Sequence, residues 1–263
     1  MSAINLVYLY LLSPLHTGGT TQEGNLLGIA RESHTNLPYV PSSTIRGRLR
    51  ASEQDQAKKF ALFGNDLDNG ETLTQGSIWV GDGSILWLPV PSLSHGVVWV
   101  SSPTLLRRWL RFSGNPDGLA VPDPYQTSLP TNAPVYLKDA ILPATSLIKW
   151  TDWDKFTSKH PESEGMQNVL VLTDQHCETL IQMSLWRQVK IKLDEHKTVN
   201  GGFRYEEAIP PDTLMYFPWG VTSQANGSSA KALTDFQSLL AKDSILQIGG
   251  QESLGRGFVQ LFS

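Results

Sequence analysis

The segment LQIGGQESLGRGFVQL, residues 246–261, places two apolar runs on either side of a glycine-rich loop. Apolar runs bounded by glycine are typical of strands, so the segment predicts a strand, a loop and a closing strand. Glycine permits positive φ angles and close backbone approach, and successive backbone N–H groups can form an anion-binding nest, to which Arg256 would add a forked phosphate donor. An ordinary glycine-rich hairpin turn is the alternative interpretation. The loop glycines are Gly249, Gly250, Gly255 and Gly257.

The first part of the chain predicts a strand, a loop and a basic helix. Residues 4–12 form an apolar run that indicates a buried strand, and the polar, glycine-rich residues 12–25 predict a loop. A helix is expected from about Ser43 to about Phe63, where Gly64 would end it. Gly47 inside this helix predicts that another segment of the chain closely approaches the helix backbone there.

The start of this helix carries a candidate phosphate site. Ser42 and Ser43 can cap the helix, and a helix N-terminus attracts anions. Arg46 and Arg50 are four residues apart and so share one helix face, where they could follow a phosphate backbone. A solvated amphipathic helix is the alternative interpretation.

The remaining elements indicate an α+β protein. The predicted order of β, α, β and then β, α, β, with long insertions, is typical of a ferredoxin-like fold. The expected elements are strands in residues 77–93 and 95–102, a helix in 102–112 capped by Ser102, an irregular insertion in 113–146, a strand signal in 177–193, a long hairpin from about 186 to 210, and a helix in 232–244.

Composition limits the class of protein. The chain has 263 residues, enough for one elaborated domain or two small ones. Its single cysteine, Cys177, cannot form an internal disulfide, which favours a reducing cytoplasm, and residues 4–12 are too short to span a bilayer. We therefore expect neither a signal peptide nor a membrane span. A net charge of −4 is weak evidence against nucleic-acid binding, but Arg46, Arg48 and Arg50 form a local basic cluster.

The sequence contains few candidates for catalysis. His16, in the first loop, could act as a general acid or contact a phosphate. No nucleophilic triad and no regular spacing of metal ligands is evident. Trp186, Phe203 and Tyr205 flank the expected hairpin, where they could stack on bases or belong to a core. Eight tryptophans leave a carbohydrate-binding β protein as an alternative, although the arginine-rich helix and the glycine loop argue against it.

Six ordered segments carry a resemblance to a known family. They are LSPLHTGG (12–19), IARESHTNLPYVPSSTIRGRLR (29–50), LFG (62–64), SIWVGDGSILWLPVPSLSHGVVWVSSPTLLRRW (77–109), GGFRYEEAIPPDTLMY (201–216) and LQIGGQESLGRGFVQL (246–261). Together they resemble the Cas seven-type backbone subunit of type III-B (Cmr) CRISPR effector complexes, in the RAMP superfamily. The match runs from Ser13 to Leu261, with a divergent centre.

The resemblance implies a single RAMP domain over residues 1–263. It would have a ferredoxin-like (RRM-like) palm, a thumb hairpin at about 186–210 and a divergent insertion at about 113–182. Copies would stack into a filament along a crRNA guide, and each thumb would interrupt the guide–target duplex and flip a base. The implied partners are the guide, single-stranded target RNA, other copies of the chain and other Cmr-type subunits, with no membrane.

The resemblance also implies which residues contact RNA. The family's guide-backbone helix corresponds to Ser42, Ser43, Arg46 and Arg50. Its glycine-rich loop corresponds to Gly249, Gly250, Arg256 and Gly257. Its thumb would present Trp186, Phe203 and Tyr205.

The family cleaves target RNA with a divalent metal, and here its key residue is missing. The family's aspartate lies just before an Ile-x-Arg-Glu segment, but the chain has the residues NLLG (25–28) there, and no aspartate precedes Asp55. His16 and Glu206 match positions linked to cleavage, whereas a tyrosine expected two residues after Glu206 is Ala208.

The leading interpretation is therefore an RNA-binding scaffold with weak or lost slicing activity. Two alternatives stay open. One is an active endoribonuclease that uses Mg²⁺ or Mn²⁺ at a shifted site with Glu23 or Glu206. The other is a guide-processing nuclease of the same superfamily.

Overall fold

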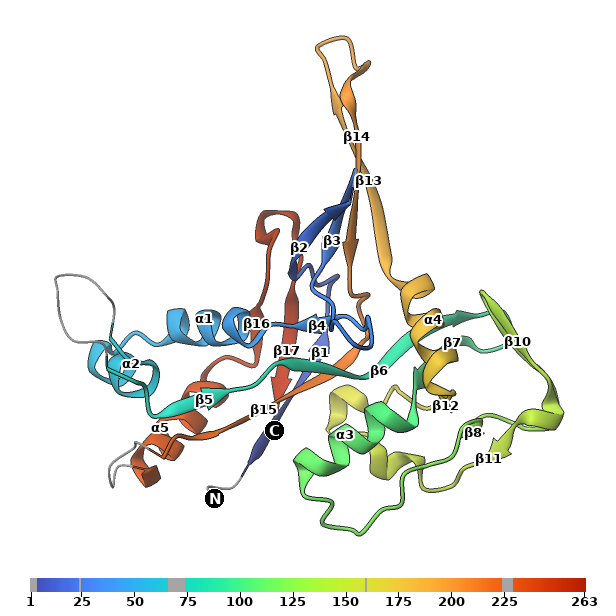
Figure 1. The fold of residues 1–263 in the computed structure, drawn as a ribbon, viewed down its shortest axis with the longest axis horizontal. Helices are drawn as coiled ribbons and strands as arrows, with labels where there is room; N and C mark the ends of the chain where they lie inside the picture. The colour runs from blue at the N-terminus through green and yellow to red at the C-terminus, as the bar shows by residue number, and fades with distance from the viewer. Residues whose placement is uncertain (1–3, 24, 66–73, 159, 224–228) are drawn as a thin grey trace.

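The computed structural model of the chain has a large mixed sheet, helices on both of its faces and a long hairpin that projects from the body (Figure 1). It describes residues 4–23, 25–65, 74–158, 160–223 and 229–263. Within these ranges, no helix has the length and apolar character needed to cross a membrane. The α+β class expected from the sequence is confirmed. The α-helices are α1 (Ser42–Ser52), α2 (Gln56–Phe63), α3 (Pro103–Ser113), α4 (Asp174–Ser184) and α5 (Ser229–Lys242).

The centre of the large sheet consists of four strands in the antiparallel order β6-β15-β1-β17. The first strand of the chain thus lies between two strands from the C-terminal part. The strands of this sheet are β1 (Asn5–Leu11), β4 (Tyr39–Val40), β5 (Ile78–Val80), β6 (Gly83–Ser92), β7 (Gly96–Ser101), β8 (Gln126–Thr127), β9 (Val135–Leu137), β10 (Ala140–Leu142), β11 (Ile148–Lys149), β12 (Val169–Val171), β15 (Leu214–Val221), β16 (Ile245–Gln247) and β17 (Phe258–Phe262).

The two faces of this sheet are covered by different parts of the chain. Successive strand residues point to opposite faces, so β15, which is buried throughout, contributes to two cores. Phe217 packs in the core that includes Ile45 of α1 and Phe236 of α5. Tyr216 packs in the core that includes Trp109 of α3. Burial on both faces explains why residues 214–221 are almost continuously apolar.

The predicted helix from Ser43 to Phe63 is two helices. The backbone is extended at Glu53 and Asp55, and the Asp55 carboxylate accepts hydrogen bonds from the N–H groups of Ala57 and Lys58. This side-chain cap starts α2 as a new helix. Gly64 ends α2 with a positive φ, as expected, but a Cβ atom added at Gly47 would meet nothing within 4 Å, so the close approach predicted there is wrong.

The strand signal expected within residues 177–193, in the segment SLWRQVKIKL (184–193), is confirmed as β13, Trp186–Leu193. The residues before it, Asp174–Ser184, form the helix α4, which the sequence did not lead us to expect. The Thr173 hydroxyl accepts a hydrogen bond from the N–H of His176 and so caps α4. The buried residues of this helix are Cys177, Leu180 and Ile181, which have helical spacing.

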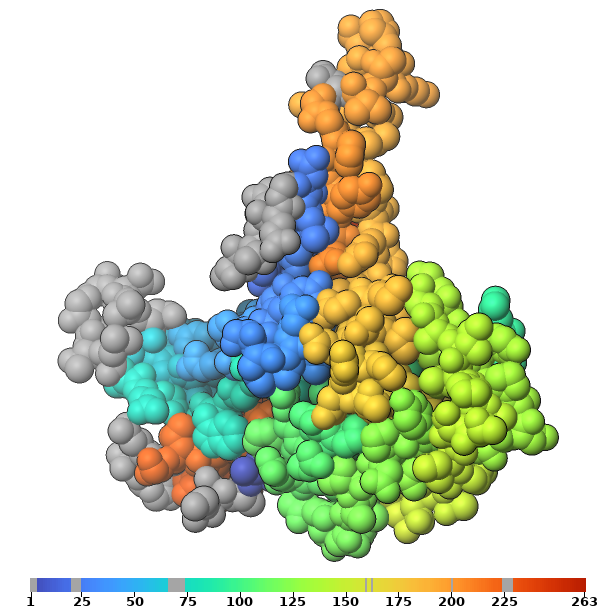
Figure 2. Space-filling model, turned by 45° about the vertical axis from the view of Figure 1, so that its right-hand side comes forward, coloured from blue at the N-terminus to red at the C-terminus, as the bar shows by residue number. Residues whose placement is uncertain are grey.

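A second sheet forms the projecting part, in the order β13-β14-β3-β2. The first loop predicted over residues 12–25 is therefore partly wrong, because its second half is a strand that pairs with residues after Asn25. The pair β13–β14 extends well beyond β2 and β3 and stands clear of the body (Figure 2). These strands are β2 (Gly18–Glu23), β3 (Leu26–Ile29), β13 (Trp186–Leu193) and β14 (Val199–Ala208).

The glycine loop between β16 and β17 is held by close backbone contacts. Gly257 has φ +78°, and a Cβ atom there would lie 1.9 Å from the carbonyl oxygen of Ile248. Gly249 has φ +80°, and a Cβ atom there would lie 2.5 Å from the carbonyl oxygen of His16. By contrast, Gly255 has φ +72° but open space around it. Gly249 therefore lets the loop pack against the segment around His16, and Gly257 lets the two arms of the loop approach each other.

Replacing Gly257 with alanine should destabilise the protein more than replacing Gly255. A positive φ alone costs an L-residue about 1–2 kcal/mol, which is the loss of unfolding free energy expected for Gly255→Ala. Gly257→Ala adds a backbone clash to that cost, so its loss should be clearly larger. Urea unfolding followed by circular dichroism measures both variants. Equal losses would mean that the contact with Ile248 is unimportant.

Candidate functional site

Three segments that are distant in sequence meet at the base of the hairpin. The N–H of Gly250 donates to the carbonyl oxygen of His16 at 2.9 Å. The Nδ1 atom of His16 lies 2.8 Å from the carbonyl oxygen of Glu207, and the side chain is buried. Because a carbonyl can only accept, Nδ1 carries the proton of the neutral ring, which leaves Nε2 as the nitrogen able to take one up.

Glu206 lies in this base with no exposed surface, and three cationic groups surround its carboxylate. The Lys190 Nζ and Arg204 Nη2 atoms are each 2.9 Å from it, and Arg256 Nη1 is 3.1 Å away. Burial alone would raise the pKa of Glu206, but Lys190, Arg204 and Arg256 stabilise the anion and the net effect is a lowered pKa. A carboxylate held in this way is a weak base.

Arg256 connects the glycine loop to the hairpin. Its guanidinium carbon lies 4.4 Å from the centre of the Trp186 ring, and its Nη2 donates to Gln188 Oε1 at 2.8 Å. Its Nη1 also donates to Gln251. Arg256 is 4% exposed, so its guanidinium is enclosed by protein groups rather than presented to solvent. Contact between this arginine and a phosphate stays a prediction.

Glu207 is a second buried carboxylate that the sequence analysis missed. It follows Glu206 in β14 and so faces the opposite side of the sheet, where Arg31 Nη2 lies 2.7 Å and Arg187 Nε 2.9 Å from its oxygens. Arg31 also donates to Gln182 of α4. The sequence did contain a signal for this residue: two adjacent acidic residues stand in a strand that leads into the apolar core. Glu207 joins the hairpin base to the end of β3 and to α4.

Residues 25–28, where the family resemblance leads us to expect an aspartate, lie beside the strand that carries these two carboxylates. β3 runs parallel to β14, with Leu26 opposite Tyr205 and Leu27 opposite Glu206. Directly opposed residues share a face, so Leu27 lies on the face of Glu206. Glu23 pairs with Leu26 through the backbone of β2, but its side chain lies outside the described part of the structure.

The described residues here do not fit a divalent metal. Mg²⁺ and Mn²⁺ need carboxylate or carbonyl oxygens that are free to coordinate, whereas Glu206 and Glu207 are both occupied by cationic side chains. Within the ranges that the structure describes, no group of three His, Cys, Asp or Glu side chains has the arrangement of a metal site.

The basic helix α1 is arranged differently from the expectation. Pro41 occupies the cap position, no side chain caps the helix, and the N–H of Ser42 donates to Asp82 at 2.7 Å. Ser43 is exposed at the start of this helix.

The two arginines of α1 interact with the end of α2. Arg46 donates to the carbonyl of Phe63, and Arg50 donates to Phe63 at 3.2 Å and to Gly64 at 2.7 Å. Burial, and secondarily the charge of Arg50, lowers the pKa of Arg46. Both arginines thus satisfy the last carbonyls of a helix, as cationic side chains often do. A role in guide binding stays a prediction for Ser42, Ser43, Arg46 and Arg50.

Beyond its base, the hairpin has two different faces. Cross-strand partners share a face, and the pairs Val189–Tyr205, Ile191–Phe203 and Leu193–Val199 are all apolar and largely exposed. The Phe203 and Tyr205 rings meet edge to face at 5.5 Å. The opposite face carries the basic pair Lys190–Arg204. Trp186, the third aromatic residue expected here, is half-buried beneath Arg256 at the base.

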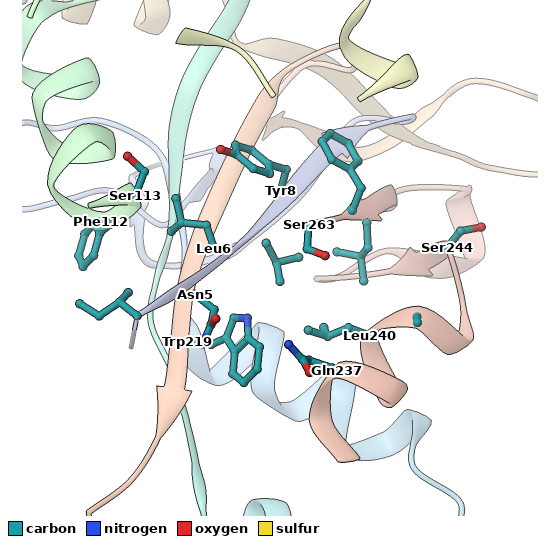
Figure 3. A pocket seen from close by; sticks show the side chains of 15 residues that line it. Asn5, Leu6, Tyr8, Phe112, Ser113, Trp219, Gln237, Leu240, Ser244 and Ser263 are labelled. Carbon is teal, nitrogen blue, oxygen red and sulfur yellow. The ribbon is translucent and has the colours of Figure 1, made fainter. Parts of the chain in front are cut away.

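A cavity of about 630 Å³ lies away from the hairpin, beside β1 and α5 (Figure 3). Trp219, Leu240 and Tyr8 line it (Figure 3). Among the described residues that line it, Tyr8 alone has a side chain that can titrate, and none of the candidate residues is included. The candidate functional site is therefore the base of the hairpin.

The sequence and the fold of this chain have clear relatives. The sequence profile of the RAMP superfamily matches residues 8–260, and the chain belongs to that superfamily. It is 27% identical over 279 residues to the CRISPR system Cmr endoribonuclease Cmr4 of Pyrococcus furiosus, which covers 97% of this chain and 94% of the relative.

Solved structures agree with this assignment. A crystal structure of oligomeric Cmr4 from Pyrococcus furiosus superposes with a TM-score of 0.73 at 25% identity, covering 99% of this chain and 97% of the other. A cryo-EM structure of type III-B Cmr-beta bound to cognate target RNA contains a chain with a TM-score of 0.76 at 18% identity, covering 98% and 96%. At 18% identity, the similarity to the Cmr-beta chain shows a shared fold.

Replacing Glu206 with glutamine should remove part of the acid sensitivity of the protein. Because the folded-state pKa of Glu206 is lowered, its ion pairs stabilise the fold above the ordinary carboxyl pKa and this stability is lost as the pH falls below it. The parent should therefore lose more unfolding free energy than Glu206→Gln between pH 5 and pH 3. At pH 7 the variant should be less stable by about 3 kcal/mol, the scale for breaking a buried ion pair.

The matched control is Glu252→Gln, which removes an exposed carboxylate from the neighbouring glycine loop. Urea unfolding at several pH values compares the three proteins. An unchanged pH profile in Glu206→Gln would show that these ion pairs do not stabilise the folded state.

Proposed function

We propose that the chain is the repeating backbone subunit of a type III-B CRISPR effector complex and binds guide and target RNA. The observation that carries the proposal is the end-to-end match with Cmr4, which covers 97% of this chain and 94% of that protein. The relatives include an oligomeric protein and a complex bound to cognate target RNA, which supports the same assembly for this chain. Its partners are a crRNA guide, single-stranded target RNA, other copies of itself and other Cmr-type subunits, in the cytoplasm.

In this proposal the central sheet is a ferredoxin-like palm and the hairpin is a thumb. The antiparallel order β6-β15-β1-β17, with α1 and α2 after β1 and α5 before β17, supports the palm. The exposed apolar pairs of β13 and β14 support the thumb, because a hairpin of this length needs a partner to pack against. Residues 113–182 are the divergent insertion of one RAMP domain.

The proposed scaffold cleaves target RNA weakly or not at all. Attack by a 2′-hydroxyl on the neighbouring phosphodiester needs that hydroxyl deprotonated, and a positioned base typically contributes on the order of 10²–10⁴ in rate. Leucine at positions 26 and 27 cannot act as a base, and Glu206 is a weak one because its pKa is lowered. Among the side chains that the structure describes at the hairpin base, His16 has a nitrogen, Nε2, that could accept a proton. Mg²⁺ or Mn²⁺ would be a cofactor only of a cleavage-competent form.

The second candidate function is an active endoribonuclease with a shifted site. The relative Cmr4 is named as an endoribonuclease. Glu23 of β2 pairs with Leu26 of β3, so its backbone lies next to the segment where the aspartate is missing. Ion pairing of Glu206 disfavours that residue as the shifted base. Cleavage assays separate this candidate from the scaffold.

The number of copies in a complex should rise with the length of the guide RNA. A backbone subunit that stacks along RNA adds one copy for each fixed length of guide, whereas an isolated processing nuclease does not. Native mass spectrometry of complexes purified with guides of two lengths measures the copy number. A single copy with both guides would overturn the proposed assembly.

Restoring a carboxylate to β3 should raise cleavage of target RNA. Leu26→Asp should accelerate cutting on the order of 10²-fold over the parent, the lower end of what a positioned base contributes. The control is Leu27→Asp, whose carboxylate would share the face of Glu206 and its cations and should give no increase. The measurement is a time course on labelled target RNA with magnesium or manganese.

The parent chain decides between the two candidates in the same assay. Rapid, regularly spaced cutting by the parent would contradict the scaffold. If Glu23→Ala then abolished that cutting, the chain would be an active nuclease with a shifted site rather than a scaffold.

A further inference from the structure

The cations around Glu206 exceed the charge that they neutralise. Lys190, Arg204 and Arg256 carry three positive charges against one carboxylate, and each lies within 3.1 Å of it. Arg256 is also enclosed by Gln188, Gln251 and Trp186, so it takes part in holding the base together. The surplus charge is therefore presented by the other two side chains, of which Lys190 is 27% and Arg204 60% exposed.

A hollow opens next to this cluster on the hairpin. It has a volume of about 390 Å³, and seven of the described residues line it, none of them acidic. Its volume falls in the range of known ligand sites, about 300–1,000 Å³. Three of its side chains are cationic, and two of its residues are glycines with positive φ that leave the backbone uncovered. The lining residues are Lys190, Ile191, Lys192, Gly201, Gly202, Phe203 and Arg204.

The pairing of the strands sets the spacing of the cations. Lys190 and Arg204 are directly opposed in the ladder, and Gln188 is opposed to Glu206. Opposed side chains share a face about 5 Å apart at their Cβ atoms, close enough for both to contact the non-bridging oxygens of one phosphate. An arginine fork beside a lysine combines bidentate hydrogen bonding with a point charge. Glu206 keeps the two like charges together when no ligand is present.

We infer that Lys190, Lys192 and Arg204 form a phosphate-binding site for an RNA backbone on the polar face of the hairpin, with Glu206 as the residue that preorganises it. The inference rests on the proposed function and deepens it, because it assigns a binding site to residues that the sequence analysis did not select. It also gives Glu206 a positioning role. This excess of positive charge lies beside β3, the strand in which the family resemblance leads us to expect a carboxylate.

The test is the salt dependence of binding to a labelled single-stranded RNA, measured with the full chain. The double variant Lys190→Gln with Arg204→Gln should bind at least tenfold more weakly at low salt. The slope of log affinity against log salt should fall by about 1.4, which is two phosphate contacts at roughly 0.7 each for a single strand. The matched control is Arg107→Gln with Arg111→Gln, which removes the same charge from exposed positions of α3 and should leave the slope close to that of the parent.

Two further variants separate binding from folding. Lys192→Gln changes a lining residue that is not among the ion-pair partners of Glu206, so it should lower the slope by about 0.7 without changing the unfolding midpoint. Lys190→Arg with Arg204→Lys keeps both charges and should restore most of the affinity. If the double variant bound weakly and the charge-retaining variant did also, the effect would be structural and the phosphate site would be wrong.

The remaining outcomes distinguish this site from the proposed function. If the parent bound RNA and the double variant had the same salt slope, the site would be overturned and the RNA-binding scaffold would stand. If the parent bound no RNA, with or without other subunits, the proposed function would fail and the site with it. If the double variant kept its RNA affinity but lost self-association in native mass spectrometry, the cations would bind an acidic surface of another copy, which also overturns the inference.

Discussion

The buried ion pair between Arg256 and Glu206 fixes how the hairpin meets the body. A buried pair of this kind contributes little net stability, because desolvation of both charges offsets their attraction, but removing one partner leaves a charge without compensation. The pair therefore favours the arrangement of hairpin and body in which both charges are paired over arrangements in which one of them is left unpaired. Arg256 comes from a loop held by the close approach of Gly257 to Ile248, so a rigid element delivers the guanidinium to the carboxylate. The Trp186 ring covers the guanidinium from the hairpin side.

Alternation along β14 divides the hairpin into surfaces with different chemistry. Glu206 and Glu207 are neighbours in sequence, yet one is bound by Lys190, Arg204 and Arg256 and the other by Arg31 and Arg187. Further out, the same alternation separates the exposed apolar pairs from the basic pair Lys190–Arg204. The net charge of −4 hides this arrangement, since affinity for phosphate depends on local charge and not on the sum over the chain.

Those parts of the fold that depend on local pattern could be predicted from the sequence. The strands β1 and β7, the helix α3 with its Ser102 cap, the helix α5 and the glycine loop between two strands all have strong periodic or turn signals. The helix α4 also had a signal, the Thr173 cap followed by buried Cys177, Leu180 and Ile181, but the apolar residues that follow masked it.

Tertiary partners determine the rest. Arg46 and Arg50 have the spacing of a phosphate-binding face, but the end of α2 lies within their reach and provides carbonyl acceptors. Residues 18–23 are polar and glycine-rich and become a strand because β3 and β14 provide a sheet edge. The burial of Glu207 depends on Arg31 and Arg187, which no short window of sequence brings together with it.

The position of β1 between β15 and β17 has a consequence for synthesis of the chain. Strands with partners this distant in sequence form late, because a long loop must close before any pairing is gained. Leu11 pairs with Val259, so the core that buries Val7, Leu9 and Leu11 cannot close until almost the whole chain has left the ribosome. At about 5–20 residues per second, the apolar first strand waits roughly 12–50 seconds for its last partner. During that interval the nascent chain exposes a strand edge that chaperones or other copies of the chain can bind.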